Sequence, residues 1–357
     1  MRIMTFDEYR IKFSTKAYQY GYSEVYVSKC LNYAARLFDK NLPVIYDFEH
    51  FCRLVGYSSS YIKRAVNSPR SFYYDYNVPK KNGNGVRLIS QPFPSLKEIQ
   101  YWILNNILYK LEVSPYAKAY VPHRKFKDNL RFHKNKKFVI TYDVANFFPS
   151  IKKEKIEAYF IELGYTELLS NLFSKLVTHR GYLPQGAPTS PYLSNLYMKQ
   201  FDNKIAAYCK CRKIFYTRYA DDLTFSSNED VDINDLFNTI KIELSILNLE
   251  LNQDKTHIMN SSSRQIVTGV VVNKRLQVPK EFRSEIRKEC YYINKFGLSE
   301  HLARIKQTNE KYYIKGLLGR INYVLQIDPT NKEFKSYKKE MQRFVIRDIN
   351  LDDYDVL

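Results

Sequence analysis

The spacing of apolar and polar residues predicts helical regions at both ends of the chain and short strands between them. Residues 1–70 have helical periodicity, and 48–56 followed by 58–66 predicts two helices joined by a glycine-containing turn. Any helical hairpin gives this pattern, so it does not by itself indicate DNA reading. Apolar residues at 96, 99, 103, 107 and 111 predict an amphipathic helix, and 279–351 is predicted to be helical throughout.

Strands are predicted where β-branched and aromatic residues lie between turn signals. Residues 71–78 and 86–90 flank a Pro-Lys-Lys-Asn-Gly-Asn-Gly turn, which predicts a hairpin with a basic tip. A strand at 138–142 ends at Asp143, and two strand-like runs flank the turn that carries Asp221 and Asp222. Further predicted elements are helices at 151–164, 166–179, 192–210 and 233–247, a Gly/Pro-rich loop at 183–191, strands up to 259, and a hairpin from 265–273 and 276–278.

The predicted order from 138 to 259 is strand, helices, hairpin, helix, strand. This is the β-α-β-β-α-β order of a split ferredoxin-like sheet, and it makes the fold class α+β. In such a sheet Asp143 and the Asp221-Asp222 pair lie on adjacent central strands. We therefore expect three carboxylates to converge on one edge of the sheet.

The charge of the chain indicates a polyanionic partner. Its 357 residues include 56 Lys and Arg against 37 Asp and Glu, a formal net charge of +19, which suits nucleic acid or an anionic membrane surface. The 32 Tyr and 22 Phe, interleaved with basic residues, favour base stacking, although many of these rings must belong to the core. No run of 18 apolar residues predicts a spanning helix, so we expect no membrane partner.

The cysteines and the N-terminal sequence favour a cytoplasmic location. The five cysteines have no paired C-x-x-C spacing, which indicates free thiols rather than zinc ligands or disulfides. Residues 1–13 contain no apolar segment typical of a secretory signal.

Adjacent carboxylates at a hairpin tip repel each other unless a cation lies between them. An isolated Asp-Asp pair is usually ordinary turn chemistry, but Asp143 offers a third carboxylate for a divalent-metal site. Phosphoryl transfer needs positioned reactants and neutralised charge, which two Mg²⁺ ions held by two or three carboxylates supply. Asp143, Asp221 and Asp222 are the predicted carboxylates.

Five segments, in chain order, resemble the motifs of reverse transcriptases. They comprise a fingers segment, a first carboxylate motif, a loop that contacts template and nucleotide, a catalytic hairpin and a motif that ends on a lysine. The segments are 84–92 with 96–100, then 141–151, 183–191, 216–222 and 249–255. The resemblance extends from about residue 71 to about residue 279 and implies a right-hand polymerase with fingers, a split ferredoxin-like palm and a helical thumb.

Two further features resemble bacterial retron reverse transcriptases. Val267-Thr268-Gly269 is similar to their Val-Thr-Gly signature, and Asn129 with His133 is similar to their Asn-Ala-x-x-His signature, with Leu130 in place of the Ala. The resemblance implies an N-terminal helical extension at 1–70, fingers at 71–137, a palm at 138–262 with a finger insertion at about 151–182, and a palm hairpin and helical thumb at 263–357.

The resemblance also implies roles for single residues in catalysis and nucleotide binding. Asp143 and Asp221 hold two Mg²⁺ ions, with Asp222 secondary and the carbonyl of Val144 as a further ligand. Lys255 neutralises or protonates pyrophosphate, unless it is only a salt-bridged surface lysine. The nucleotide-binding residues implied are Arg87 and Lys80 or Lys81 for the triphosphate, Phe148 as a steric gate against the ribose 2′-OH, and Gln185 and Gly186 behind the template base and incoming nucleotide. Phe148 is equally compatible with a place in the core.

RNA contacts are expected from the signature residues and from the start of the C-terminal helices. His133 is as compatible with a structural role as with RNA contact. The expected RNA-binding residues are Asn129, His133, Val267, Thr268, Gly269, Lys280, Arg283 and Arg287, with Lys288 on the same helix.

For a member of this family we expect DNA synthesis on a cognate structured non-coding RNA that serves as template and primer. The resemblance implies priming from a 2′-OH of that RNA, a branched RNA–DNA product (msDNA), dNTP substrates, an effector protein and a role in anti-phage defence. The C-terminal region has no carboxylate set typical of RNase H, so a host RNase H must remove the RNA. The alternatives are a maturase-like or other defence-associated reverse transcriptase, and a non-catalytic scaffold that binds structured RNA.

Overall fold

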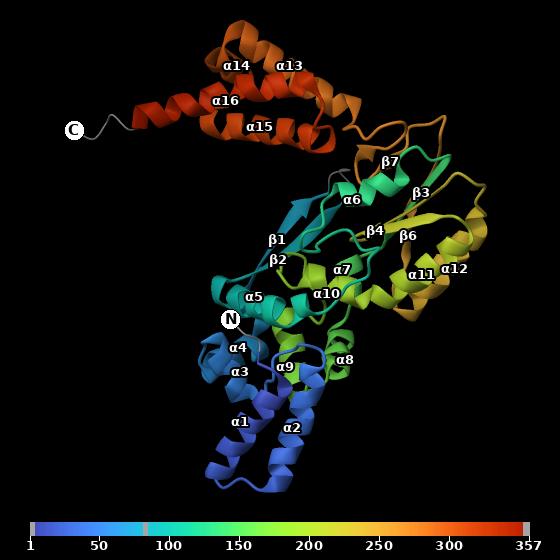
Figure 1. Ribbon diagram of the computed structural model, residues 1–357. Helices are drawn as coiled ribbons and strands as arrows, with labels where there is room; N and C mark the ends of the chain where they lie inside the picture. Colours follow the sequence, from blue (N-terminus) through green and yellow to red (C-terminus); the bar gives the residue numbers. More distant parts are fainter. Residues whose placement is uncertain (1–3, 81–84, 353–357) are drawn as a thin grey trace.

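The computed structural model describes residues 4–80 and 85–352, with side chains up to residue 345. Four helices form its N-terminal part: α1 (Phe6–Gln19), α2 (Glu24–Phe38), α3 (Phe48–Val55) and α4 (Ser59–Asn67). Each follows a Ser, Thr or Asp whose side chain accepts a hydrogen bond from a backbone N–H of the first turn. The α1–α2 pair projects from one end of the molecule (Figure 1).

The predicted basic hairpin is present as β1 (Tyr73–Pro79) and β2 (Val86–Pro92), paired antiparallel. The tip of this hairpin, residues 81–84 with Lys81 among them, lies outside the described residues. The helix predicted to reach residue 111 is shorter: α5 (Pro94–Asn106) is followed by a 3₁₀ turn at Leu108–Lys110. A short helix, α6 (Lys127–Leu130), and a 3₁₀ turn at Arg131–His133 follow in the basic segment.

A four-stranded antiparallel sheet lies at the centre of the molecule. Its strands are β3 (Phe138–Val144), β4 (Phe215–Tyr219), β5 (Asp222–Ser227) and β6 (Leu251–Asn260), in the spatial order β4-β5-β3-β6. With the intervening helices this is the split ferredoxin-like arrangement that the sequence predicted.

The helices between these strands are α7 (Phe147–Ser150), α8 (Lys153–Leu163), α9 (Glu167–Val177), α10 (Ser190–Tyr197), α11 (Lys199–Cys211) and α12 (Ile233–Ile246). The single helix predicted at 192–210 is in fact two, because the backbone at Met198, with ψ near −2°, turns the chain between α10 and α11. Helices α11 and α12 lie side by side near the sheet (Figure 1).

The two faces of the sheet differ because strand side chains alternate in direction. On β3, Ile140, Tyr142 and Val144 belong to the large core that includes the residues of α11 and α12, whereas Val139 belongs to a second core. Asp143 alternates with the first set, so it projects from the other face.

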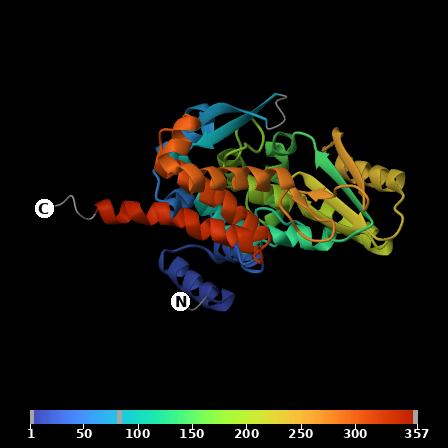
Figure 2. The same cartoon turned by 90° about the horizontal axis from the view of Figure 1, so that it is seen from above.

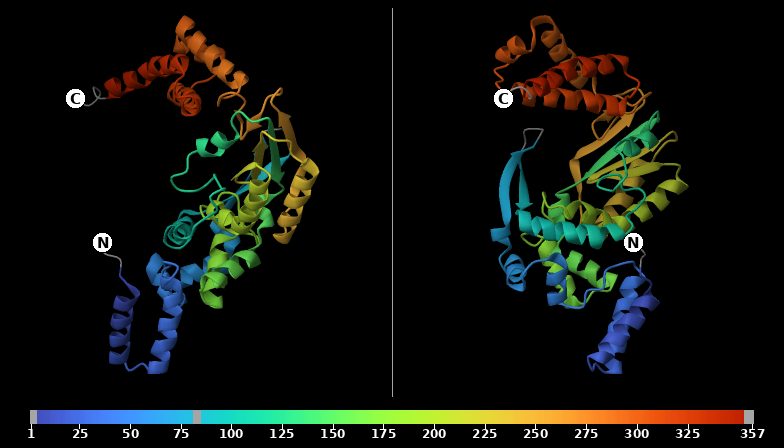
Figure 3. Two further views of the ribbon diagram at one scale, coloured as in Figure 1. Left: turned by 45° about the vertical axis from the view of Figure 1, so that its right-hand side comes forward. Right: turned by 60° about the vertical axis from the view of Figure 1, so that its left-hand side comes forward.

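The C-terminal part has a small hairpin and four helices. These are β7 (Ile266–Val267), β8 (Val270–Val271), α13 (Lys280–Phe296), α14 (Leu298–Arg304), α15 (Glu310–Ile327) and α16 (Lys332–Asp352). The predicted partner strand at 276–278 is reduced to one bridge between Val271 and Gln277. The helices lie beyond one end of the sheet and of the β1–β2 hairpin, and α16 extends to the side (Figures 2 and 3).

Two hydrophobic cores hold these parts together. The larger one joins side chains of α2–α4 to α5, α9 and the sheet, so most of the N-terminal helices pack on the central body. The second joins α13–α16 to Leu130 and Val139. No helix in the described residues is long and apolar enough to cross a bilayer, and all five cysteines are free thiols.

Candidate active site

Asp143 lies near the carboxyl end of β3, one of the two central strands of the sheet. It pairs in register with Asp222 on β5 and with Asn252 on β6. The backbone N–H of Val144 donates to the carbonyl oxygen of Asp221 at 3.0 Å, which ties β3 to the hairpin tip. The structure therefore places Asp143 and Asp222 on adjacent central strands, with Asp221 in the turn just before β5.

A tight turn presents Asp221. Tyr219 pairs with Asp222, so Ala220 and Asp221 form a two-residue connection between β4 and β5. Ala220 has φ of +58°, a left-handed conformation that costs a non-glycine residue about 1 kcal/mol. Its carbonyl oxygen accepts a hydrogen bond from Nη1 of Arg218 at 3.1 Å, so a side chain of β4 holds the strained turn.

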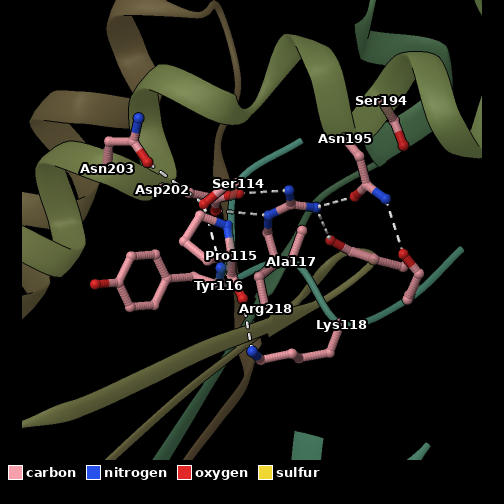
Figure 4. A network of polar contacts seen from close by, with 12 residues as sticks. Ser114, Pro115, Tyr116, Ala117, Lys118, Ser194, Asn195, Asp202, Asn203 and Arg218 are labelled. Carbon is pink, nitrogen blue, oxygen red and sulfur yellow. Dashed lines mark hydrogen bonds and ion pairs between the residues drawn. The ribbon is translucent and has the colours of Figure 1, made fainter. Parts of the chain in front are cut away.

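The guanidinium of Arg218 is fully buried in a polar network that the sequence analysis did not predict (Figure 4). Its Nε and Nη2 donate to the two carboxylate oxygens of Asp202 on α11, at 2.8 and 2.7 Å. Nη1 also donates to Oδ1 of Asn195 on α10 at 3.0 Å. The sequence contained one indication of this network. Arg218 is two residues from the buried Tyr216 and Ala220, so its side chain points to the same inward side, where a charge needs a partner.

Burial and mutual repulsion shift the protonation of the acids at the hairpin. Burial raises the pKa of Asp222 to about 7, and the charges of Asp221 and Asp143 act in the same direction. Burial also raises the pKa of Asp221, with a contribution from Asp143, while Lys255 and Arg87 oppose the shift. The protein itself therefore leaves this cluster short of positive charge, a condition that a bound cation would relieve.

Lys255 contacts Asp143 directly. Its Nζ lies 3.0 Å from both carboxylate oxygens, and Nδ2 of Asn252 donates to Oδ1 at 3.3 Å. In the part of the chain that the structure describes, no three His, Cys, Asp or Glu side chains are arranged to hold a metal ion on their own. The donors present still fit Mg²⁺, which prefers oxygen ligands and completes its shell with water and phosphate oxygens.

The predicted triphosphate residues lie on the β1–β2 hairpin. Arg87 on β2 is exposed and close enough to Asp221 to lower that group's pKa against the effect of burial. Lys80 is also exposed, and its backbone N–H donates to the carbonyl oxygen of Gly85 at 3.0 Å.

Gln185 and Gly186 contact the same hairpin. The carbonyl oxygen of Gln185 accepts from the N–H of Ser90 at 2.7 Å. Gly186 has φ of +119°, and a Cβ there would lie 2.9 Å from the carbonyl oxygen of Ser90. The glycine is thus required for close packing against β2, whereas the sequence analysis explained it by approach to the nucleotide and template.

Phe148, on the short helix α7 that follows β3, is half-buried. Its ring centroid lies 5.4 Å from that of Phe147 and 6.5 Å from that of Tyr120. Tyr120, which the sequence analysis missed, has φ of +61°, and burial together with the charge of Asp221 raises its pKa. Such a conformation is rare for an aromatic residue and marks a constrained position beside the site.

Asn129 and His133 are fully buried, which contradicts their predicted direct contact with RNA. Both ring nitrogens of His133 are engaged at 2.7 Å, Nδ1 with Oγ of Ser226 and Nε2 with Oγ1 of Thr217. The Thr217 hydroxyl also donates to Oδ1 of Asn129 at 2.7 Å, and Nδ2 of Asn129 donates to Oγ1 of Thr268 at 2.8 Å. The two signature segments therefore meet behind the β4–β5 hairpin.

The other predicted RNA-binding residues differ in exposure. Val267 is fully buried and cannot contact RNA in this structure, whereas Thr268 is half-exposed and Gly269 exposed. Lys280 is exposed, and Nε of Arg283 donates to the carbonyl oxygen of Val278. Further along α13, Arg287 forms a bidentate ion pair with Glu333, at 2.6 and 2.8 Å, while Lys288 is exposed.

Comparisons with known proteins show which family the chain belongs to. The reverse transcriptase (RNA-dependent DNA polymerase) family matches residues 78–293. The retron Ec86 reverse transcriptase of Escherichia coli is 34% identical over 299 residues, which cover 82% of this chain and 88% of that protein. The retron Mx65 reverse transcriptase of Myxococcus xanthus is 31% identical over 305 residues, covering 77% and 71%. A solved foamy viral protease–reverse transcriptase in complex with double-stranded DNA gives a TM-score of 0.41 at 13% identity, over 84% of this chain and 49% of that chain.

The chain belongs to the reverse transcriptase family and, within it, to the retron reverse transcriptases. The predicted enzyme class, an RNA-directed DNA polymerase, is confirmed, as is the predicted α+β fold with its split ferredoxin-like sheet.

Proposed function

We propose that this polymerase copies a cognate structured non-coding RNA into DNA, starting from a 2′-OH of that RNA and giving branched RNA–DNA (msDNA). The observation that carries the proposal is the cluster of Asp143 and Asp222 on adjacent central strands with Asp221 in the turn before β5, where Asp143 raises the pKa of both other acids and Asp221 raises that of Asp222. The names of the related retron reverse transcriptases support the choice of substrate.

Two Mg²⁺ ions would be held by the carboxylates of Asp143 and Asp221 and the carbonyl of Val144, with Asp222 in a secondary role. When bound, they supply the charge that favours an attacking hydroxyl and a leaving pyrophosphate. In the structure the ammonium group of Lys255 is hydrogen-bonded to Asp143. We propose that it turns from Asp143 to the pyrophosphate. Asn252 then keeps Asp143 in place.

The incoming dNTP would lie between the carboxylates and the β1–β2 hairpin. Arg87 and Lys80 are exposed there and suited to the triphosphate, Arg87 through paired N–H donors. Gln185 and Gly186 would support the template base and the nucleotide through the loop that is bonded to β2. The half-buried Phe148 would crowd a ribose 2′-OH and so select deoxyribonucleotides.

The cognate RNA would contact exposed groups at the junction with the C-terminal helices. Thr268, Gly269 and Lys280 are the accessible candidates. Arg283 and Arg287 would contribute if they exchanged their hydrogen bonds to Val278 and Glu333 for contacts with RNA. We propose the divisions 1–70, 71–137, 138–262 and 263–357 as N-terminal extension, fingers, palm, and palm hairpin with thumb.

The cellular part of the proposal follows from the family. We propose a cytoplasmic enzyme that acts with a separate effector protein in anti-phage defence, while a host RNase H removes the RNA template. A short non-coding RNA locus found beside the coding sequence would support this proposal, and sequencing of nucleic acid that co-purifies with the protein would identify the RNA.

The double substitution Asp221→Asn, Asp222→Asn tests the catalytic assignment. It preserves size but removes charge, so DNA synthesis on an annealed primer–template should fall by at least about 10²-fold, because electrostatic stabilisation of the transition state is lost. The variant should retain its thermal unfolding transition and bind the duplex. Near-normal DNA synthesis by this variant would refute the site.

A further inference from the structure

A groove lies among the N-terminal helices. These helices lie at the opposite end of the molecule from α13–α16 (Figures 1 and 3). The volume of the groove is about 560 Å³, and its lining runs from Met4, before α1, to Tyr20 just after it, with Tyr26 of α2 and Arg53 of α3. Its lining residues are spread along α1, a helix of 14 residues that is about 20 Å long. The groove lies outside the segment that matches the polymerase family, and no residue of the proposed active site lines it.

Aromatic rings line the groove. Tyr22 and Tyr26 stack with ring centroids 5.0 Å apart and an interplanar angle of 18°, beside Tyr20, which is 73% exposed. Near the middle of α1, the half-buried rings of Phe13 and Tyr46 stack at 5.6 Å and 29°. Exposed rings such as those of Tyr20, Tyr22 and Tyr26 accept unpaired bases of any sequence, because every base has a π-face.

Three basic side chains also line the groove. Lys12 and Lys16, one helical turn apart on α1, and Arg53 on α3 are exposed lining residues, and none of them forms an ion pair with another described residue. The lining carboxylate, Asp47, caps α3, where its Oδ1 accepts from the N–H of His50 at 2.7 Å. The positive charge of the groove is therefore largely uncompensated within the protein.

We propose that this groove binds a single-stranded segment of nucleic acid, with bases stacked on the tyrosines and phosphates against Lys12, Lys16 and Arg53. A duplex hides its base faces, so the stacking surface selects an unpaired strand. Charge favours nucleic acid over a protein segment, because three cations without partners suit an occupant with one negative charge per residue. RNA and DNA share this chemistry, and the test separates them.

The position of the strand can be mapped by photo-crosslinking on the full-length protein. The polymerase site is first saturated with an unlabelled annealed RNA–DNA duplex, and a U-rich RNA or T-rich DNA oligonucleotide carrying 5-iodouracil is then added. We expect crosslinked peptides that contain Tyr20, Tyr22 or Tyr26, and the yields of the two oligonucleotides show which strand is preferred. Crosslinks confined to residues around the four-stranded sheet would overturn the proposal.

Matched variants separate stacking from apolar contact. Tyr20→Leu with Tyr22→Leu preserves apolar bulk but removes both rings, and should weaken oligonucleotide binding by about tenfold per ring. Tyr20→Phe with Tyr22→Phe retains the rings and should bind as the wild type does. Equal binding by the Leu and Phe pairs would refute stacking.

The proposed phosphate contacts are tested by the salt dependence of oligonucleotide binding. Lys12→Gln with Lys16→Gln should make the plot of log binding constant against log salt concentration shallower by about 1.4, since each neutralised phosphate of a single strand contributes about 0.7. An unchanged slope would contradict these contacts. Primer extension on an annealed substrate should be unaffected in all variants, so failure of this site would leave the polymerase assignment intact.

Discussion

Arg218 shows how one buried side chain can set the geometry of a catalytic turn. It reaches two oxygens of Asp202, the amide of Asn195 and the carbonyl of Ala220, and so ties α10 and α11 to the residue before Asp221. A planar group with five donors can satisfy all these acceptors at once, which a lysine cannot. Arg218 therefore acts as a positioning residue, three positions before Asp221.

Arg218→Lys preserves the charge but loses the donor fork. We expect the left-handed turn to shift, so that kcat falls by about 100-fold while KM for dNTP changes little, as expected for a misplaced catalytic group. Steady-state primer extension measures both constants. The matched control is Lys204→Met, which breaks the exposed ion pair with Glu243 at 2.8 Å and should leave kcat unchanged. An unaltered kcat in Arg218→Lys would show that the turn does not depend on the fork.

His133 makes the stability of the fold depend on pH. Burial, together with the charges of Lys136 and Lys118, lowers its pKa to about 3, well below the value of about 6.5 expected in the unfolded chain. A group whose pKa is depressed on folding favours the native state above its unfolded pKa. This contribution is lost as the pH falls below about 6.5, by up to about 1.4 kcal/mol per pH unit.

His133→Gln should therefore be less stable than the wild type at pH 7 but should lose less stability on acidification. Urea unfolding at pH 7, 6 and 5 gives the free energy of unfolding for both proteins, and the two profiles should converge by about 1 kcal/mol per unit below pH 6.5. His123→Gln, at an exposed position, should run parallel to the wild type. Parallel profiles for His133→Gln would exclude a buried neutral His133.

At the scale of elements, the sequence predicts the helices and strands whose signals lie within a few neighbouring residues. The strands β3, β4 and β5 could be predicted because apolar alternation and turn signals lie within a few residues of each other. β6 is a continuous ten-residue edge strand where short strands were predicted, since its many exposed residues weaken the alternation. The irregular register between β3 and β6 at Thr141/Asp143 depends on tertiary pairing and has no local signal.

The same distinction holds for the site. Asp143, Asp221 and Asp222 could be named because each lies in a short motif at a strand end. The contact between Asn129 and Thr268 joins residues 139 apart, and the Arg218–Asp202 pair joins a strand to a preceding helix. Neither the contacts nor the burial of Asn129 and His133 follows from spacing. The motif that was predicted to bind RNA lies inside the protein, where it is hydrogen-bonded to β4, β5 and Thr268.

The prediction at the scale of elements concerns the β7–β8 hairpin and its role in positioning the cognate RNA. Thr268 and Gly269 have φ of +47° and +81°, and the threonine bears this strain while its hydroxyl accepts from Asn129. Thr268→Ala with Gly269→Ala should abolish synthesis on the cognate structured RNA but preserve extension of a generic primer on a homopolymer template. Both are measured as DNA product per unit time.

The conservative control is Thr268→Ser, which keeps the hydroxyl that Asn129 contacts and should retain both activities. Equal loss on both templates in the double variant would mean that the hairpin supports the palm and does not position the RNA.

At the scale of the whole molecule, two hydrophobic cores hold the parts together, and an excess of positive charge favours binding to nucleic acid. The larger core unites the N-terminal helices with the sheet, and the second core holds the C-terminal helices together with Leu130 and Val139. The net charge of +19 lies on a protein whose substrate is a polyanion.

Binding of an annealed RNA–DNA duplex should therefore depend steeply on salt. If about six phosphates are contacted, raising salt from about 50 to about 200 mM should weaken binding by about 10³-fold through counterion release. Fluorescence anisotropy with the catalytically inactive Asp221→Asn, Asp222→Asn variant measures this without turnover. A dissociation constant that stays within a factor of two over this range would contradict phosphate contacts as the main source of affinity.

The contacts between the C-terminal region and residues 129–139 limit how this enzyme can be recombined. A hybrid that took residues 263–357 from a protein without the threonine of the Val-Thr-Gly signature would leave the buried amide of Asn129 without its acceptor. A donor that has this threonine would still place foreign apolar side chains against Leu130 and Val139. The interchangeable module is thus not the C-terminal region alone but that region together with 126–139 and the β4–β5 strands. Modular exchange among these polymerases must respect a boundary in space that does not coincide with any single break in the chain.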